Sequence, residues 1–147
     1  MRRSEFITNQ EDFKKLTAAQ LMETDVKTFS PDAPWEEMAE AMTKGNFGSV
    51  PIVDADSKLL GIVSEYDLIH AIIEGRDLAK ITARDIMKKN PVIVMEGTDV
   101  KKIATLLEKE HLIRVPVVKD DKLAGIVARR DLLFGYLRAT AKPPLWL

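Results

Sequence analysis

The sequence predicts an α+β fold with mixed sheets, made of two copies of one unit that pack about a pseudo-two-fold axis. The first observation is an internal repeat, because residues 17–22 (TAAQLM) return as 82–87 (TARDIM) and residues 50–53 (VPIV) return as 115–118 (VPVV). The second is that hydrophobic residues change between a period of two and a period of 3.6 within each copy. The order is strand, helix, strand, strand, helix. One copy is too small to close its own core, so the copies are expected to pack together.

The elements of the first copy follow from this change of period. Strands are expected over residues 26–29, 49–53 and 59–64. A helix begins near Pro34, which the first helical turn tolerates, and ends at Gly45 as the C′ glycine. Its apolar stripe, Trp35, Met38 and Met42, is interpreted as core or dimer contact and not as a cofactor site. The last helix is expected over about 65–74.

The second copy repeats these signals with different residues. Strands are expected over residues 114–118 and 123–128, and the final helix over 129–137. Thr98 is the expected N-cap of the intervening helix. A short helical lead-in precedes each copy, at Thr17 and at Thr82. Two different sequences therefore encode one pattern.

The flanks differ from the repeats. The predicted organisation is an N-terminal helical extension (1–16), a first repeat (17–74), a short connector (75–81), a second repeat (82–138) and a C-terminal tail (139–147). Thr8 and Glu11 resemble a capping box that opens the extension. The last residues, 142–147 (KPPLWL), cannot be helical through their prolines, and they either fray or dock on a neighbouring subunit.

Composition excludes several classes of function. A hydrophobic content of 46% in 147 residues can build a core, whereas a net charge of −1 disfavours binding to duplex DNA. The chain has no cysteine and two histidines, so no metal site is expected. A signal peptide and an apolar run that could span a bilayer are both missing, so a cytoplasmic protein without membrane contact is predicted.

The candidate chemistry lies where residues 61–67 (GIVSEYD) close a strand and open a helix. Backbone N–H groups at a helix start can seat phosphate, and the Asp67 carboxylate can accept both hydroxyls of a ribose. The structural alternative is that Ser64 and Asp67 simply cap the helix. The second copy keeps Asp131 but replaces the serine with Ala128, a pairing that capping alone does not require. His70 has no matched acid or nucleophile and is interpreted as packing or surface, whereas His111 either serves as a partner of a helix C-terminus or touches phosphate close to Arg114.

These features resemble a pair of CBS domains, the Bateman module, over residues 17–137. The resemblance rests on the tandem order, the VPIV and VPVV strands and the doubled glycine-to-aspartate motif. It implies a pseudo-symmetric body with two clefts that bind AMP, ADP, ATP or S-adenosylmethionine. It also implies association of two modules into a homodimer.

The resemblance nominates residues for each cleft by position. The main cleft would be formed by Ile62, Ser64, Tyr66, Asp67, Pro91, Val92, Ile113, Arg114 and Arg130. The second and weaker cleft would be formed by Lys27, Ser49, Ile126, Ala128 and Asp131. In the main cleft the aspartate would hold ribose and the two arginines would face phosphate, because a guanidinium fork matches phosphate oxygens. Two unequal sites are expected.

The resulting prediction is a stand-alone regulatory module and not an enzyme, with no catalytic residue and no catalytic cofactor. Its effector would be a separate, unidentified protein. The alternative is a CBS-fold interaction protein that has lost ligand binding. A hydrolase or transferase would need a nucleophile and base that the sequence does not show, and nucleic-acid binding is a minor option.

Overall fold

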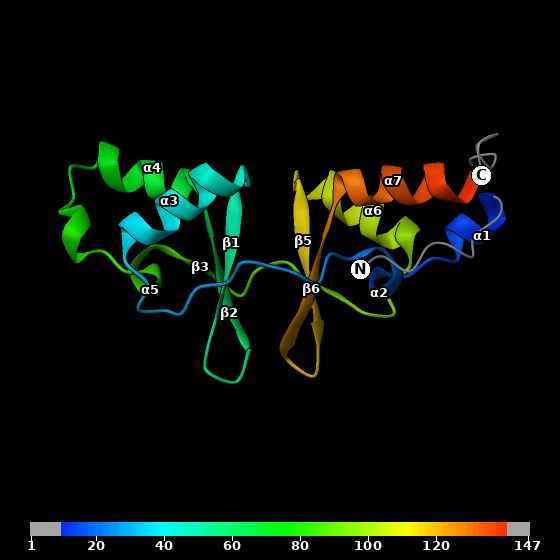
Figure 1. The fold of residues 1–147 in the computed structure, drawn as a ribbon, viewed down its shortest axis with the longest axis horizontal. Helices are drawn as coiled ribbons and strands as arrows, with labels where there is room; N and C mark the ends of the chain where they lie inside the picture. Colours follow the sequence, from blue (N-terminus) through cyan, green and yellow to red (C-terminus); the bar gives the residue numbers. More distant parts are fainter. Residues whose placement is uncertain (1–9, 141–147) are drawn as a thin grey trace. The chain divides into compact units, whose positions relative to one another are not determined.

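The computed structural model describes residues 10–140, and they form two compact units (Figure 1). The Asp67 unit consists of residues 27–91 and 121–123. The Asp131 unit consists, among the described residues, of 10–26, 92–120 and 124–140. Each unit is named after the acidic residue at the start of its last helix. The α+β class predicted from the sequence is confirmed.

The Asp67 unit is a small antiparallel sheet with helices beside it. Its elements are α3 (Trp35–Gly45), β1 (Ser49–Val53), β2 (Leu59–Ser64), α4 (Glu65–Ile73), the 3-10 helix η1 (Leu78–Lys80), α5 (Ala83–Ile86) and β3 (Lys88–Lys89). The strand order is β1-β2-β3, and Ser49 lies opposite Ser64 in the β1–β2 ladder. Helices α3 and α4 lie on the same side of the β1–β2 pair (Figure 1). The hairpin therefore delivers the end of β2 directly into α4.

The Asp131 unit repeats the hairpin and its helices, but its third strand pairs with the first strand of the hairpin and not with the second. Its elements are α1 (Gln10–Lys14), α2 (Ala18–Leu21), β4 (Val94–Met95), α6 (Val100–Lys109), β5 (Arg114–Lys119), β6 (Lys122–Ala128) and α7 (Arg129–Thr140). The strand order is β4-β5-β6, with β4 parallel to β5. The end of β6 leads into α7 as β2 leads into α4.

Each lead-in helix packs on the repeat that it does not precede in sequence. Helix α2 comes before the first repeat, yet the Ala18 N–H donates to the Thr98 carbonyl at 2.8 Å, in the Asp131 unit. Helix α5 comes before the second repeat, yet the Ala83 N–H donates to the Ala33 carbonyl at 2.9 Å, in the Asp67 unit. The compact units therefore differ from the sequence repeats by an exchange of these short helices.

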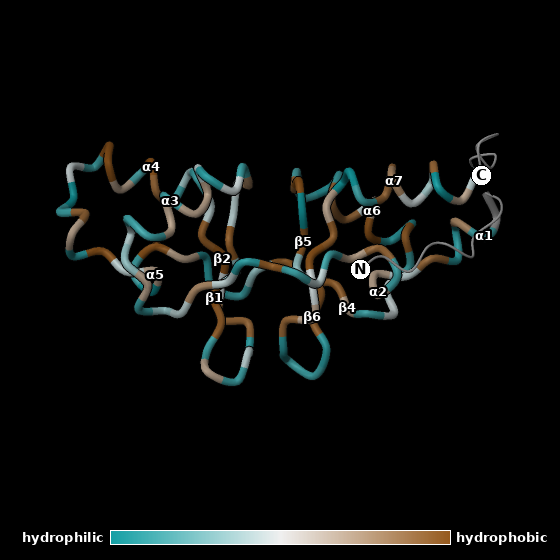
Figure 2. Tube along the Cα trace, in the orientation of Figure 1, coloured by the Kyte–Doolittle hydropathy of each residue, from teal (hydrophilic) through white to brown (hydrophobic). Residues whose placement is uncertain are grey.

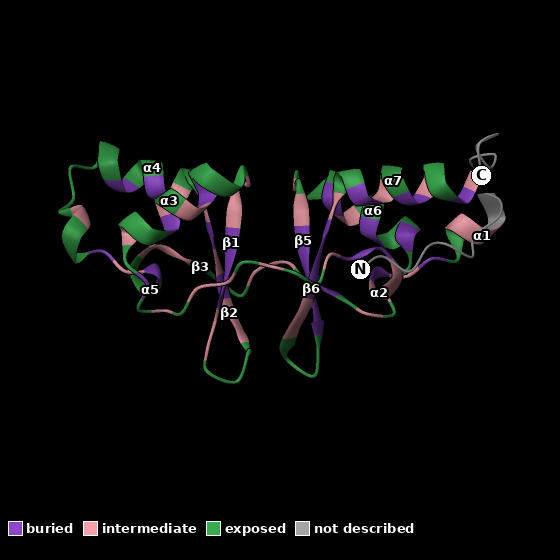
Figure 3. Cartoon of the chain, viewed as in Figure 1, coloured by how far each residue is buried: buried purple, intermediate pink, exposed green. Residues whose placement is uncertain are grey.

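Each unit buries its own hydrophobic core (Figure 3). Met38 in the Asp67 unit and Ile103 at the equivalent position of the Asp131 unit are both fully buried. Met42 joins the first of these cores, and Trp35 packs against it while its indole N–H donates to the Leu68 carbonyl at 3.2 Å. The interpretation of this stripe as core is confirmed. Burial of one such side chain stabilises the fold by about 1.5 to 3 kcal/mol.

Two equivalent glycines each allow a neighbouring backbone segment to approach the last strand of the hairpin closely. A Cβ on Gly61 would lie 2.7 Å from the Lys88 carbonyl oxygen, and a Cβ on Gly125 would lie 2.7 Å from the Glu23 carbonyl oxygen. Both separations are shorter than a carbon atom allows, so any larger residue must push the neighbouring backbone away. The close approach explains why both copies of the motif begin with glycine.

Some predicted element ends are wrong. No strand forms over residues 26–29, where Phe29 makes only an isolated bridge to Ile52. The chain turns at residues 31–32, too soon after this bridge for a longer ladder. Helix α7 runs on to Thr140, beyond the predicted end at residue 137.

The predicted caps also need correction. Pro34 is the N-cap of α3 and not part of its first turn. Gly45 is the last helical residue, and Asn46 adopts the left-handed cap conformation with φ 55°, which asparagine tolerates well. Asp99, not Thr98, caps α6, because its carboxylate accepts the Lys102 N–H at 2.8 Å.

The predictions for both chain ends fall partly outside the structure. Helix α1 is present at residues 10–14, but Thr8 and the tail residues 142–147 lie outside the described residues.

Candidate functional site

The Asp67 corner is the junction of β2 and α4. The Asp67 carboxylate reaches back to the helix start, where its Oδ2 accepts the Ser64 N–H at 2.8 Å and the Ser64 hydroxyl at 3.1 Å. The Asp67 N–H donates to the Ser64 Oγ at 3.3 Å, which completes a capping box. Asp67 and Ser64 are half-buried, and Ile62 is half-buried on the strand behind them. Solvent therefore reaches a carboxylate that is already held in place.

The Asp131 corner is the junction of β6 and α7. The Asp131 Oδ2 accepts the Ala128 N–H at 2.8 Å, the same bond as in the other corner. Ala128 has no hydroxyl, so the other two hydrogen bonds of the capping box cannot form. Asp131 is only 3% exposed and Ile126 is 5% exposed. The same scaffold thus holds an open carboxylate in one unit and a buried carboxylate in the other.

Arg114 is the electrostatic partner of Asp131 within this unit. The Arg129 N–H donates to the Ile113 carbonyl at 2.9 Å, and this bond brings the start of α7 beside the start of β5. Burial lowers the pKa of the Arg114 guanidinium, and the negative charge of Asp131 opposes that shift. The equivalent position in the Asp67 unit is Ser49, which carries no charge.

Sequence reasoning placed Arg114 and Asp131 in different clefts and missed that they are neighbours. A signal existed, because the repeat places Arg114 at the position of Ser49, and Ser49 is paired in register with Ser64 at the Asp67 corner. Arg114 begins β5, the sheet neighbour of the strand that leads to Asp131. Arg114 could therefore have been expected beside Asp131.

The other nominated residues divide between the units. Tyr66, Pro91, Lys27 and Ser49 belong to the Asp67 unit, whereas Val92, Ile113 and Arg130 belong to the Asp131 unit. Tyr66 and Ile113 are strongly exposed, at 76% and 62%, and Arg130 is also exposed. The structure thus brings Ile62, Ser64, Tyr66 and Asp67 together at one corner and Ile113, Arg114, Ile126, Ala128, Arg130 and Asp131 at the other.

Lys27 contributes to a surface pocket inside the Asp67 unit. The pocket has a volume of about 450 Å³ and is lined by Lys27, Phe29, Glu37, Glu40, Ala41, Lys44 and Phe47. The Lys27 ammonium lies 5.1 Å from the centre of the Phe29 ring, within range of a cation–π contact. The Lys44 ammonium lies 4.0 Å from Glu40. The charges lining the pocket therefore balance, which gives it no preference for an anion.

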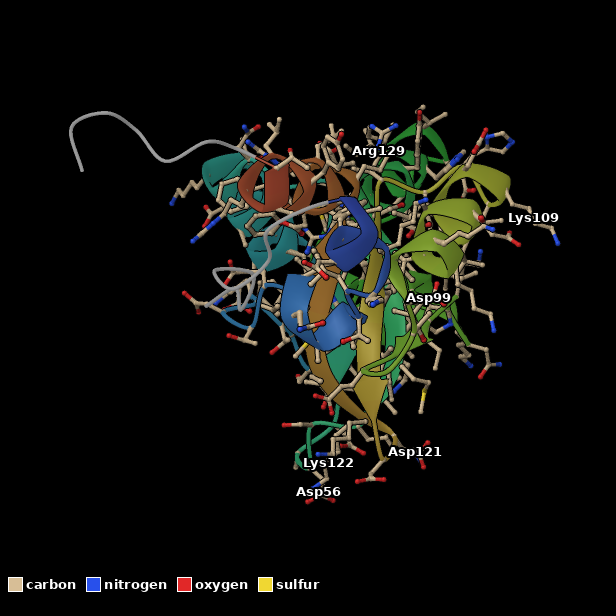
Figure 4. All side chains as sticks on the ribbon, turned by 90° about the vertical axis from the view of Figure 1, so that its right-hand side faces the viewer. Asp56, Asp99, Lys109, Asp121, Lys122 and Arg129 are labelled. Carbon is tan, nitrogen blue, oxygen red and sulfur yellow. The ribbon has the colours of Figure 1, made fainter. Side chains whose placement is uncertain are left out.

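The remaining polar residues fit structural roles. His111 lies two residues beyond the end of α6 in the left-handed conformation, with φ 53°, at the position equivalent to Asn46. His70 is exposed on α4. The carboxylates Asp56 and Asp121 lie exposed at hairpin tips (Figure 4). Within residues 10–140, no helix has the length and apolar character needed to cross a membrane.

A family model described as "CBS domain" matches residues 18–74 and 83–138. The uncharacterised protein MK0525 of Methanopyrus kandleri is 32% identical over 122 residues, which cover 82% of this chain and 62% of that protein. YlbB of Bacillus subtilis, also uncharacterised, is 39% identical over 99 residues, and the chain spans 66% of its length. The chain also matches enzymes, such as the inosine-5′-monophosphate dehydrogenase of Aquifex aeolicus, at 28% identity over 21% of that enzyme.

Solved structures of similar fold contain adenosine ligands. CBSX2 in complex with AMP has a TM-score of 0.74 and 26% identity, over 84% of this chain and 97% of that chain. The CBS domain pair of MJ0100, in complex with 5′-methylthioadenosine and S-adenosyl-L-methionine, has a TM-score of 0.71 and 30% identity, over 81% of this chain and 95% of that chain.

Proposed function

The chain belongs to the CBS domain family, and from this premise we propose that it is a regulatory module that binds AMP, ADP, ATP or S-adenosylmethionine in a cleft between its repeats. The observation that carries the proposal is the half-buried Asp67 carboxylate, held by Ser64 at the start of α4. The adenosine ligands in the structures of CBSX2 and MJ0100 support it.

The Asp67 corner suits a ribose for a chemical reason. A carboxylate is a hydrogen-bond acceptor only, and a ribose offers two neighbouring hydroxyl donors. Bonds from the Ser64 N–H and hydroxyl fix the carboxylate before a ligand arrives, so little side-chain entropy is lost on binding. Ile62 and Tyr66 would flank the sugar, and Pro91 with Val92 would border the adenine.

We propose that Arg114, Arg130 and Ile113 complete this main site and that the arginines meet the phosphate. The Asp131 corner, with Lys27, Ser49, Ile126 and Ala128, is the weaker site. Asp131 is buried and interacts electrostatically with Arg114, so a ligand there would have to compete with that interaction. Two unequal sites follow, with phosphorylated ligands favouring Asp67.

The signal would pass through a change of conformation or assembly in a homodimer, since a ligand shifts an equilibrium only by binding two states unequally. The effector would be a separate protein, and the chain itself would have no catalytic activity. The cytoplasmic location stays a prediction from the sequence. The competing function is an interaction protein of the same fold that binds no ligand.

Calorimetric titration of the purified chain with AMP, ADP, ATP and S-adenosylmethionine tests the proposal. Asp67→Ala should remove binding at the main site, because the ribose acceptor is lost. Asp131→Ala is the matched control at the equivalent position and should leave the main site able to bind. Arg130→Ala should weaken binding of AMP about tenfold or more but leave binding of adenosine unchanged, since adenosine has no phosphate.

Saturable binding that survives Asp67→Ala would contradict this assignment of the site. Equal affinity of both sites for AMP would contradict their inequality. If no ligand produces heat, and if the melting temperature is also unchanged at high ligand concentration, the ligand-free interaction protein becomes the better description.

A further inference from the structure

The pocket between residues 27–29 and α3 has no role in the proposed function, apart from Lys27 at its edge. Its volume of about 450 Å³ is typical of small-molecule sites, which range from about 300 to 1,000 Å³. All of its lining residues belong to the Asp67 unit. Its chemistry can therefore be derived from this unit alone.

The floor of the pocket is apolar and is fixed by the core beneath it. Phe29 and Phe47 are both half-buried and pack against the core of the Asp67 unit. The Phe29 N–H donates to the Pro51 carbonyl at 3.1 Å, and this bond holds the segment against β1. A Cβ on Gly45 would collide with the Phe47 ring, so this ring lies over the end of α3. Both rings are thus in place before a ligand arrives.

The rim of the pocket carries charges of both signs. Glu37, Glu40 and Lys44 share one face of α3, because they are three and four positions apart. Figure 2 shows hydrophilic and hydrophobic positions alternating along this helix. Glu40 is paired with Lys44, whereas Lys27 lies over the Phe29 ring. Among the residues that the structure describes, neither Lys27 nor Glu37 forms an ion pair. The rim therefore offers one cation and one anion to a ligand.

The equivalent place in the Asp131 unit is built from different residues. Ala41 in the pocket wall is equivalent to Leu106, 65 positions further along the chain. Leu106 is half-buried and packs against the core of its unit, so it occupies volume that an alanine leaves open. Glu37 is replaced there by Lys102. The open wall and the acidic rim are therefore particular to the first repeat and are not required by the fold.

Balanced charges above an apolar floor favour a ligand with the same balance. A nucleotide carries net negative charge, which Glu37 and Glu40 would repel. A purely apolar molecule would leave Lys27 and Glu37 without partners. A neutral α-amino acid carries one ammonium and one carboxylate, and an apolar side chain adds the group that the floor requires. Such a zwitterion complements each part of the pocket.

We propose that this pocket binds a neutral α-amino acid with a large apolar side chain, such as phenylalanine or leucine. The ligand's ammonium pairs with Glu37 and its carboxylate pairs with Lys27. Its side chain lies against Phe29 and Phe47. Because the two charged groups of the protein are exposed, each ion pair contributes little, and the expected Kd is about 1 mM. The inference goes beyond the proposed function, since it assigns a second class of ligand to the protein.

Titration of the isotopically labelled full chain with L-phenylalanine, followed by NMR, tests the proposal. The amide signals of Phe29, Ala41 and Phe47 should shift and saturate. Phenethylamine lacks the carboxylate and 3-phenylpropionate lacks the ammonium, so each should bind about threefold more weakly. Equal affinities for the three compounds would overturn recognition of a zwitterion. Signals that stay unshifted at about twenty times the expected Kd would overturn the site itself.

Filling the pocket provides a test of its location. Ala41→Leu introduces the residue that the equivalent position of the other unit carries, so it should keep the fold and abolish binding of L-phenylalanine. Thr43→Leu is the matched control, because it adds an apolar group at an exposed position of α3 outside the pocket and should leave binding unchanged. Unchanged melting temperatures would establish that both variants are folded. Binding that survives Ala41→Leu would place the ligand elsewhere.

Exchange of the rim charges tests the contacts without filling the pocket. Glu37→Gln should weaken binding of L-phenylalanine about threefold but should not weaken binding of 3-phenylpropionate, which has no ammonium. Lys27→Gln should weaken binding of L-phenylalanine about threefold but should not weaken binding of phenethylamine, which has no carboxylate. An equal loss of affinity for all three compounds in either variant would contradict the assigned contacts.

AMP separates this inference from the proposed nucleotide site. Ala41 is not among the residues assigned to that site, so Ala41→Leu should bind AMP as the wild-type chain does. AMP that shifts the Phe47 signal and competes with L-phenylalanine would make the pocket part of the nucleotide site and overturn the inference. A chain that binds L-phenylalanine but no nucleotide would retain this inference and contradict the proposed function alone.

Discussion

The Asp67 and Asp131 corners share one backbone scaffold but differ in two nearby side chains and in the exposure of the carboxylate. In both corners the aspartate accepts the N–H of the residue that ends the strand, at 2.8 Å. Ser64 and its ladder partner Ser49 are small and neutral in the first corner, whereas Ala128 and Arg114 occupy the equivalent positions in the second. The first carboxylate is half-buried and the second is 3% exposed. Duplication thus preserved the helix start while the neighbouring positions diverged.

The two corners differ, but the scaffolds that hold them are alike. Alanine substitutions at equivalent core positions should therefore lower the free energy of unfolding by equal amounts. Met38→Ala and Ile103→Ala each remove a fully buried side chain and should each lower the free energy of unfolding by about 3 kcal/mol. Urea denaturation monitored by circular dichroism measures both. A loss in one unit below half of the loss in the other would mean that the scaffolds are not equivalent.

Asp131 should contribute more than Asp67 to stability, whereas Asp67 should contribute more than Asp131 to ligand binding. Asp131→Ala should cost about 2 kcal/mol of unfolding free energy, because it removes a buried hydrogen bond and leaves the half-buried Arg114 without its carboxylate. Asp67→Ala should cost about 1 kcal/mol, since water can replace part of what is lost there. Equal costs in urea denaturation would argue against the electrostatic interaction of Asp131 with Arg114 as the distinguishing feature.

Exchange of the capping residues should make the two corners more alike in their contribution to stability. Ser64→Ala removes the hydroxyl that accepts the Asp67 N–H and should lower stability by about 1 kcal/mol. Ala128→Ser supplies the missing hydroxyl to α7 and should raise stability by about 0.5 kcal/mol. Thermal unfolding of the two variants checks both signs. A destabilising Ala128→Ser would show that the buried corner has no room for the hydroxyl.

The smallest expected effect concerns the caps of the lead-in helices α2 and α5, and it depends on pH. Thr82 caps α5 together with Asp85, whose pKa is lowered from 3.8 by hydrogen bonds from Thr82, whereas the equivalent residue beside Thr17 is the neutral Gln20. A lowered pKa in the folded state stabilises the protein above pH 3.8, and this contribution is lost as the pH falls toward the lowered value.

Asp85→Asn should therefore reduce the loss of stability between about pH 4 and pH 2. Gln20→Asn is the control at the equivalent position, and it should leave the pH dependence unchanged. Denaturation series at several pH values measure both variants. An unchanged slope for Asp85→Asn would mean that this cap makes no contribution in acid.

Local sequence predicted the parts of the fold that depend on neighbouring residues. The predicted strands 49–53 and 59–64 agree with β1 and β2, because two apolar runs joined by a short polar turn specify a hairpin within one segment. The helix ends were predicted less well. Asparagine and glycine both adopt the left-handed conformation, and Thr98 and Asp99 are both good caps, so composition alone could not choose between adjacent residues.

The sequence by itself determined that one unit occurs twice, where its hairpins lie and that an aspartate begins the last helix of each copy. Only the tertiary structure decided that α2 and α5 exchange places and that Arg114 lies beside Asp131. Hydrogen bonds within a hairpin or a helix start join residues a few positions apart, so a short window of sequence contains both partners. The Ala18 bond to Thr98 and the Arg129 bond to Ile113 join residues from separate segments, and their partners are chosen by packing.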